Sequence, residues 1–158
     1  MQFDARVLLT AGALLLANCA ASTSLMNKTE LTAFATRYAA AWSSQNPASL
    51  AAFYEEDGSL RVNAGAPAVG RAAIAAKAQA FMTAFPDMVV KLDEMSGGGS
   101  HATFHWIWTG TNTGPGGTGK AVRIMGYEEW TLGAQGLIAE SKGHYDEEEY
   151  KRQVNSGG

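Results

Sequence analysis

Two carboxylic acids near the C-terminus, Glu128 and Asp146, are the residues of this sequence best suited to proton transfer. Glu128 lies in a strand-like run, 122–132, whose other even-numbered positions are apolar or glycine. A carboxylate on an apolar row is costly to bury, so its pKa rises toward neutrality. Two acids in one pocket push their pKa values apart, which leaves one base and one protonated donor. We therefore expect one of these acids to act as the base and the other as the protonated donor.

These residues belong to three strand-like runs between 102 and 146, and the last turn decides which of them meet. A three-residue loop at 134–136 places Gly136 at the left-handed position of such a loop and pairs Gly133 with Leu137. A four-residue turn would shift the register by one and move the last strand's set to the opposite sheet face. The shorter loop is our expectation.

With the three-residue loop, Glu128 faces Lys142 and shares its surface with Glu140, His144 and Asp146. Gly126 leaves room among them. In the structural alternative, Glu128 and Lys142 form a cross-strand ion pair and Asp146 fixes the end of the chain.

The segments before this sheet are mostly helical. Asn27 and Glu30 have the spacing of a capping box and begin a helix with one apolar stripe through Trp42. Asn46-Pro47 starts a second helix that buries Leu50, Phe53 and Tyr54 and ends at Asp57-Gly58; a third covers 71–85. Strands are predicted at 59–63 and 88–95. Three helices followed by a curved antiparallel sheet form an α+β fold.

Composition limits the classes of function. The 158 residues fit one domain, and a net charge of −3 with scattered basic residues does not indicate nucleic-acid binding. The histidines and acids lack metal-ligand spacing, so we expect no metal and no cofactor. No run is long enough for an integral membrane span in the mature chain.

The N-terminus is typical of a targeting segment. An apolar run at 7–17 precedes Cys19, which stands in a sequence similar to a bacterial lipobox. We expect a leader or disordered extension at 1–26, a domain at 27–153 and a flexible tail at 154–158. Export to the periplasm or medium, with lipidation of Cys19 as one form of it, is favoured slightly over a cytoplasmic location.

The motifs AAW…AFY, AFPD, WTGTNTG and GLIAES…YD…RQ, in this order, resemble the SnoaL-like branch of the nuclear transport factor 2-like superfamily over 29–153. The resemblance implies a cone-shaped fold with an apolar pocket between sheet and helices, often dimerised through the sheet. Members include polyketide cyclases, ketosteroid isomerases, limonene epoxide hydrolases and non-catalytic proteins.

Carried over by residue, Asp146 matches the acid that closes the last strand, and Glu128 an often acidic position on the strand before it. Tyr38 lies where ketosteroid isomerases carry an oxyanion-hole tyrosine. We therefore expect Asp146 to act as the base, with Glu128, Tyr38 or His144 donating to a developing enolate. Asn112 stands where cyclases commonly have histidine, and Lys142 where an aromatic residue is common. The candidate ligand contacts are Tyr38, Trp42, Trp106, Asn112, Trp130, Lys142 and His144.

The function expected from these residues is cofactor-independent acid–base catalysis of the isomerase or cyclase type, or a hydrolase reaction, on a small apolar ligand bearing a carbonyl group. The alternative is a non-catalytic ligand-binding or dimerisation module of the cell envelope. Phe104, Trp106 and Trp108 on one side of their strand and Ile107 on the other indicate that both sheet faces are covered. A homodimer through the sheet would supply the second layer.

Overall fold

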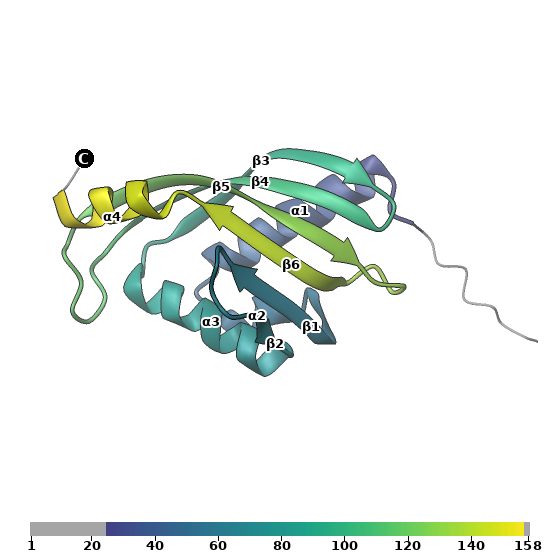
Figure 1. The fold of residues 1–158 in the computed structure, drawn as a ribbon, viewed down its shortest axis with the longest axis horizontal. Coiled ribbons are helices and arrows are strands. Elements are labelled where there is room, and N and C mark those ends of the chain that lie inside the picture. Colours follow the sequence, from purple (N-terminus) through teal and green to yellow (C-terminus); the bar gives the residue numbers. More distant parts are fainter. Residues whose placement is uncertain (1–24, 157–158) are drawn as a thin grey trace, which may run out of the picture.

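The computed structural model describes residues 25–156, which form one curved sheet with helices along its inner side and at its end (Figure 1). The helices are α1 (Lys28–Ser43), α2 (Pro47–Ala51), α3 (Arg71–Ala84) and α4 (Glu147–Ser156). The strands are β1 (Tyr54–Val62), β2 (Ala68–Val69), β3 (Val89–Gly98), β4 (His101–Thr111), β5 (Ala121–Leu132) and β6 (Ile138–Tyr145). The expected α+β fold is confirmed, with a fourth helix that the sequence analysis did not predict.

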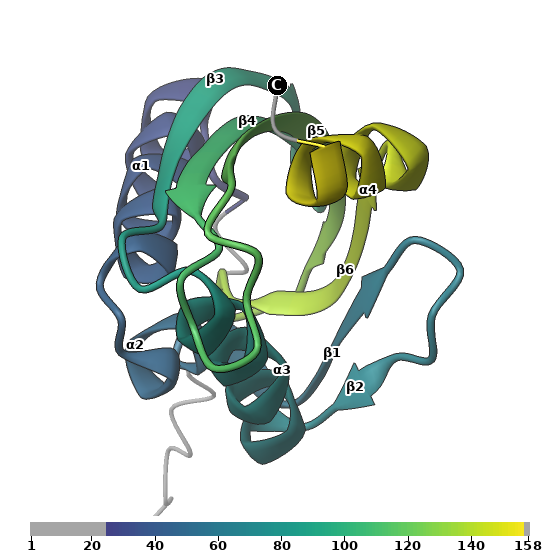
Figure 2. The same cartoon turned by 90° about the vertical axis from the view of Figure 1, so that its left-hand side faces the viewer.

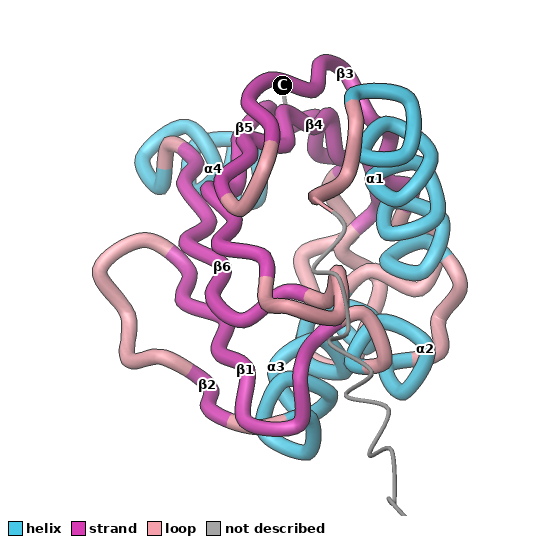
Figure 3. Tube along the Cα trace, turned by 90° about the vertical axis from the view of Figure 1, so that its right-hand side faces the viewer, coloured by secondary structure: helices cyan, strands magenta, loops and turns pink. Residues whose placement is uncertain are grey.

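The six strands follow the order β2-β1-β6-β5-β4-β3 and do not close into a barrel. Their pairings are antiparallel except that of β1 with β6, which is parallel. Figure 2 shows the sheet bending around an interior that α1 and α3 close from the other side, and Figure 3 shows the same enclosure from the opposite end. The concave face of the sheet therefore holds the core.

α1 forms for the reasons that its sequence indicates. The Asn27 side chain accepts a hydrogen bond from the Glu30 backbone N–H, and the Glu30 carboxylate accepts one from the Asn27 N–H, which confirms the capping box. The predicted apolar stripe is buried, including Leu31, Phe34 and Tyr38. This stripe brings Tyr38 and Trp42 to the interior.

The second helix is shorter than predicted. It ends at Ala51, and Tyr54 already begins β1, where the sequence analysis continued the helix to Asp57. The spacing of Leu50, Phe53 and Tyr54 fits a helix locally, but pairing of β1 with β6 and β2 decides the structure. Gly58 belongs to this strand: a Cβ there would lie 2.8 Å from the Ile138 carbonyl oxygen, so glycine permits the close approach.

The turn between β5 and β6 is the three-residue loop that was predicted. The Gly133 N–H donates to the Leu137 carbonyl oxygen, and Gly136 has φ of +71°. Leu132 accordingly pairs with Ile138.

The register that we inferred from this loop is nevertheless wrong beyond Ile138. Thr131 pairs with Glu140, so Ala139 is an extra residue on β6 and forms a β-bulge. Glu128 therefore faces Gly143 in place of Lys142, and Gly126 faces Tyr145 in place of His144. One inserted residue reverses the side of the sheet to which every later side chain of β6 points.

The two ends of the chain relate differently to the predicted boundaries. The targeting segment with Cys19 lies outside the described residues, except for Leu25 and Met26. Helix α4 extends to Ser156, within the segment 154–158 that we expected to be a tail. Within 25–156, no helix combines the length and apolarity that crossing a membrane requires.

Candidate active site in the cone

A narrow cavity lies between the concave face of the sheet and helices α1 and α3. The space open to the centres of water-sized groups is about 60 Å³. Apart from Glu128 and the Tyr145 hydroxyl, its walls are aliphatic or aromatic side chains and one glycine. They are Trp42, Leu60, Val62, Phe81, Met88, Val90, Trp106, Trp108, Glu128, Gly143 and Tyr145.

Glu128 is 5% exposed, and one of its two carboxylate oxygens is fully engaged by the protein. Its Oε2 accepts hydrogen bonds from Ser141 Oγ at 2.7 Å, from Tyr38 Oη at 2.8 Å and from Trp130 Nε1 at 2.9 Å. Within the described chain, no hydrogen bond uses the other oxygen, Oε1. The donors fix the orientation of the carboxyl group, which lines the cavity, and leave Oε1 without a partner among the described residues.

Two opposing effects act on the proton affinity of Glu128. Burial raises the pKa of Glu128 above its ordinary value of 4.5, while the hydrogen bonds from Trp130, Ser141 and Tyr38 act in the opposite direction. The net result is a raised pKa. A carboxyl group of this kind exchanges protons closer to neutral pH than an exposed one does.

Two tyrosines support the carboxylate from behind. The Tyr38 and Tyr54 hydroxyl oxygens are 2.7 Å apart, and both side chains are fully buried. Burial, and next the nearby charge of Glu128, raises the pKa of both hydroxyls well above 10.0, so both remain neutral donors. Tyr38 thus stabilises the carboxylate; it does not line the cavity, where an oxyanion-hole donor was expected.

Tyr145 supplies a second oxygen-bearing side chain to the cavity. The lining also includes three buried indole N–H groups that have no hydrogen-bond partner in the described part of the chain, those of Trp42, Trp106 and Trp108. It lies opposite Gly126 in the pairing of β5 with β6, while Glu128 lies opposite Gly143, so Tyr145 is a diagonal neighbour of Glu128 on the same face. Burial raises the pKa of Tyr145, which keeps the hydroxyl protonated at neutral pH. Its hydroxyl makes no hydrogen bond to another side chain in the described structure.

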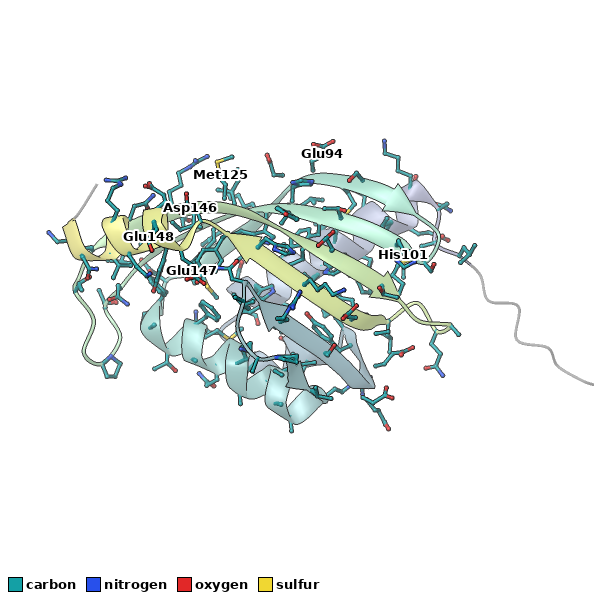
Figure 4. All side chains as sticks on the ribbon, in the orientation of Figure 1. Glu94, His101, Met125, Asp146, Glu147 and Glu148 are labelled. Carbon is teal, nitrogen blue, oxygen red and sulfur yellow. The ribbon has the colours of Figure 1, made fainter. Side chains whose placement is uncertain are left out.

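Asp146 does not meet Glu128. Its Oδ1 accepts the backbone N–H groups of Glu148 and Glu149, each at 3.0 Å, and its carbonyl accepts the Tyr150 N–H. It is exposed, and Figure 4 shows it with Glu147 and Glu148 at the start of α4. Asp146 is the N-cap of α4, and the expectation that it shares a sheet face with Glu128 is wrong because β6 ends at Tyr145.

The bulge also places Lys142 and His144 on the convex face, away from the cavity. Lys142 forms an ion pair with Glu140 at 3.1 Å, so the alternative pairing with Glu128 is absent. The His144 ring stacks on Tyr127, and its Nε2 lies 2.9 Å from Glu129.

The other candidate ligand contacts divide into cavity walls and supports. Trp42 and Trp106 line the cavity, and Trp106 crosses the space that a Cβ on Gly126 would occupy. Trp130 lies behind Glu128, stacked on Phe104. Asn112 is a loop support: its Oδ1 accepts the Thr118 N–H, and its Nδ2 donates to the Ala84 carbonyl.

Sequence reasoning missed Tyr145, Ser141 and Tyr54 as members of the site. A signal for the first two exists in β6, where the charged or ionisable residues Glu140, Lys142 and His144 alternate with Ser141, Gly143 and Tyr145. That alternation favours exposing the first set and burying the second. Nothing local marks Tyr54, which joins the network through β1.

Comparison with known proteins agrees with the fold. A family model described as SnoaL-like domain matches residues 35–141. No curated protein sequence matches the chain significantly.

Among solved structures, the chain is similar to three that share its fold. A hypothetical protein with a ketosteroid isomerase-like fold from Catenulispora acidiphila DSM 44928, in complex with trimethylamine, is 20% identical, with a TM-score of 0.69 over 77% of this chain and 91% of that one. A putative SnoaL-like polyketide cyclase from Jannaschia sp. CCS1 is 13% identical, with 0.67 over 84% and 99%. The epoxide hydrolase/cyclase-like enzyme SalBIII, of pyran ring formation in the polyether salinomycin, is 16% identical, with 0.67 over 78% and 95%.

Proposed function

We propose that this chain, which belongs to the SnoaL-like domain family, is a cofactor-independent acid–base enzyme of the isomerase or cyclase type. The family's fold supports a ligand-binding or cyclase-type function. The single observation that carries the finer proposal is Glu128, a buried carboxyl group that lines an apolar cavity, with one oxygen held by three donors and the other without a hydrogen-bond partner in the described structure.

In the proposed reaction, Glu128 is the base and the substrate is a small apolar molecule bearing a carbonyl group. Oε1 removes a proton from the carbon next to the carbonyl, and Tyr145 donates a hydrogen bond to the oxygen on which negative charge develops. The protonated Glu128 then returns the proton to the same or another carbon. The apolar walls of the cavity exclude water from the bound enolate.

This assignment replaces the expected pairing of Asp146 and Glu128. One carboxyl group suffices, since Glu128 acts in turn as base and acid. Tyr145 takes the donor role given to Tyr38, because Tyr38 Oη already donates to Glu128 Oε2.

Deuterium exchange into small ketones tests the proposal without knowledge of the natural substrate. Butan-2-one and cyclohexanone in D₂O should exchange their α-protons faster with the protein than without it, as followed by proton NMR. Glu128→Gln keeps an acceptor for the three donors and should lower this rate by roughly 10²–10⁴. Tyr145→Phe should lower it by roughly 10²–10³.

Asp146→Ala is the matched control. It removes the α4 cap, which costs about 1 kcal/mol and lowers Tm by roughly 2–4 °C, while the exchange rate per folded molecule stays unchanged. Equal exchange rates for wild type and Glu128→Gln would exclude Glu128 as the base. Exchange no faster with wild type than without protein, although the ketones bind, would leave the non-catalytic binding protein.

We also propose a homodimer through the convex face of the sheet. Met125 and Tyr127 are 57% and 38% exposed there, beside the half-buried His105 and Ile107. We name these four residues the convex patch. Figure 4 shows Met125 projecting from the side of the sheet opposite α3.

A further inference from the structure

The walls of the cavity form an aromatic box. Trp42 and Phe81 meet at 83° with ring centroids 6.0 Å apart, and Phe81 and Trp108 meet at 90° and 5.9 Å. Three successive walls are thus perpendicular aromatic rings. Trp106 and Tyr145, with centroids 6.5 Å apart, belong to the same lining.

The formal charge inside this box is the charge of Glu128 alone. The lining includes no Lys, Arg or His side chain, and none of the donors to Oε2 is a cation. An ionised carboxylate at this depth is costly without a positive partner. Within the described residues the protein provides it with hydrogen bonds on one oxygen but with no counter-charge.

We infer that this cavity binds small organic cations, specifically tertiary or quaternary methylated ammonium groups. Aromatic faces attract such cations, and Oε1 of Glu128 supplies the opposite charge. The size fits as well: on the scale of about 10–15 Å³ for one water, 60 Å³ holds about four to six water-sized groups. A trimethylammonium group has four heavy atoms. As a quaternary ion it carries no N–H, and as a protonated tertiary amine it carries one, for which Oε1 of Glu128 is the acceptor.

This ligand class goes beyond the proposed reaction. A quaternary ammonium ion has no carbonyl group, and it would occupy the oxygen that the proposed reaction uses as base. The cation should therefore compete with the ketones. Its binding does not depend on whether the protein is a catalyst.

Proton linkage separates this proposal from neutral ligand binding. A cation selects the ionised Glu128, so its affinity should rise with pH until Glu128 is ionised in the free protein. A neutral ligand that accepts a hydrogen bond from protonated Glu128 shows the reverse. The other titratable groups around Glu128 are the phenols of Tyr38 on α1, Tyr54 on β1 and Tyr145 on β6, and their raised pKa values keep them neutral between pH 5 and 8.

The test compares choline with its neutral isostere 3,3-dimethylbutan-1-ol by titration calorimetry between pH 5 and 8. Wild type should bind choline at least roughly tenfold more tightly than the isostere at pH 8, with affinity that increases from pH 5. Glu128→Gln should weaken choline roughly ten- to hundredfold and leave the isostere unchanged. Phe81→Leu, which replaces one aromatic wall by an aliphatic one, should weaken choline roughly two- to fivefold.

Equal affinity for choline and the isostere, or a choline affinity that falls as pH rises, would overturn the inference and describe a merely apolar cavity. Absence of choline binding to folded wild type would overturn it too. If wild type binds choline as expected but does not accelerate ketone exchange, only the proposed reaction is contradicted. Ketone exchange that choline does not inhibit would contradict only the inference.

Discussion

At the scale of single residues, Glu128 links function to stability. Because its pKa is raised in the folded state, the folded protein holds this proton more tightly than the unfolded chain does. The stabilisation is therefore fully present below the unfolded pKa, near 4.5, and is lost as pH rises through the folded pKa. A site that favours proton transfer is in this way a site that weakens the fold at neutral pH.

Glu128→Gln should remove that dependence. The difference in Tm, variant minus wild type, should grow from pH 4.5 upward and level off once Glu128 is ionised in the folded protein. Thermal unfolding by circular dichroism between pH 4 and 8 measures it. Glu56→Gln, which changes an exposed carboxyl group on β1, is the control. A difference that shrinks as pH rises would place the folded pKa below the unfolded one.

At the scale of elements, the bulge at Ala139 determines which chemistry enters the cavity. It directs Ser141, Gly143 and Tyr145 toward the core. Ser141 is one of the donors to Glu128, and Tyr145 is the proposed donor to the substrate. If Ala139 were paired in regular register instead, Lys142 and His144 would face the core beside Glu128.

Deletion of Ala139 should be tolerated, because it removes only the extra residue. Ile138 stays opposite Leu132 and Glu140 stays opposite Thr131, so every later side chain of β6 keeps its face. Ala139→Ser, which keeps the bulge, should remain within about 1 kcal/mol of wild type. Both variants should give dispersed amide NMR spectra with the wild-type β5–β6 contacts. Loss of dispersion in the deletion variant alone would show that the bulge does more than set the register.

Local signals in the sequence predicted most of the elements and part of the site. The capping box at Asn27 and the loop at Gly136 depend on near neighbours in the chain, so they could be identified and are confirmed. The bulge at Ala139 is a register shift between β5 and β6, and the strand at Tyr54 depends on pairing with β6, more than 80 residues away. Sequence patterns contain no direct record of such pairing.

The same distinction explains the candidate residues. Glu128 stood out because its own strand makes it anomalous, whereas the faces of Lys142, His144 and Tyr145 follow from a bulge outside their immediate neighbourhood. Asp146 was misassigned because a strand end and a helix N-cap both favour an aspartate. The charge alternation of β6 would have corrected the assignment of Lys142 and His144 to the face of Glu128.

At the scale of the whole molecule, the convex patch is the surface that a second copy would cover. Met125→Arg places a charge at its most exposed apolar residue and should convert a dimer of twice 16.7 kDa into a monomer. Light scattering at micromolar concentration measures the mass. Val69→Arg is the matched control, since Val69 is 62% exposed but lies on β2 at the far edge of the sheet. A monomeric wild type, or equal dissociation by both variants, would exclude this interface.

The tryptophans give the molecule an optical property. Of the four in the chain, Trp42, Trp106 and Trp108 line the cavity, and Trp130 donates to Glu128. The tryptophan fluorescence of the protein therefore originates from side chains that line the cavity or contact Glu128. Entry of a molecule, or ionisation of Glu128, should change the emission intensity and wavelength of the unlabelled protein. A chemical library can thus be screened by fluorescence on the native chain, before any substrate has been identified.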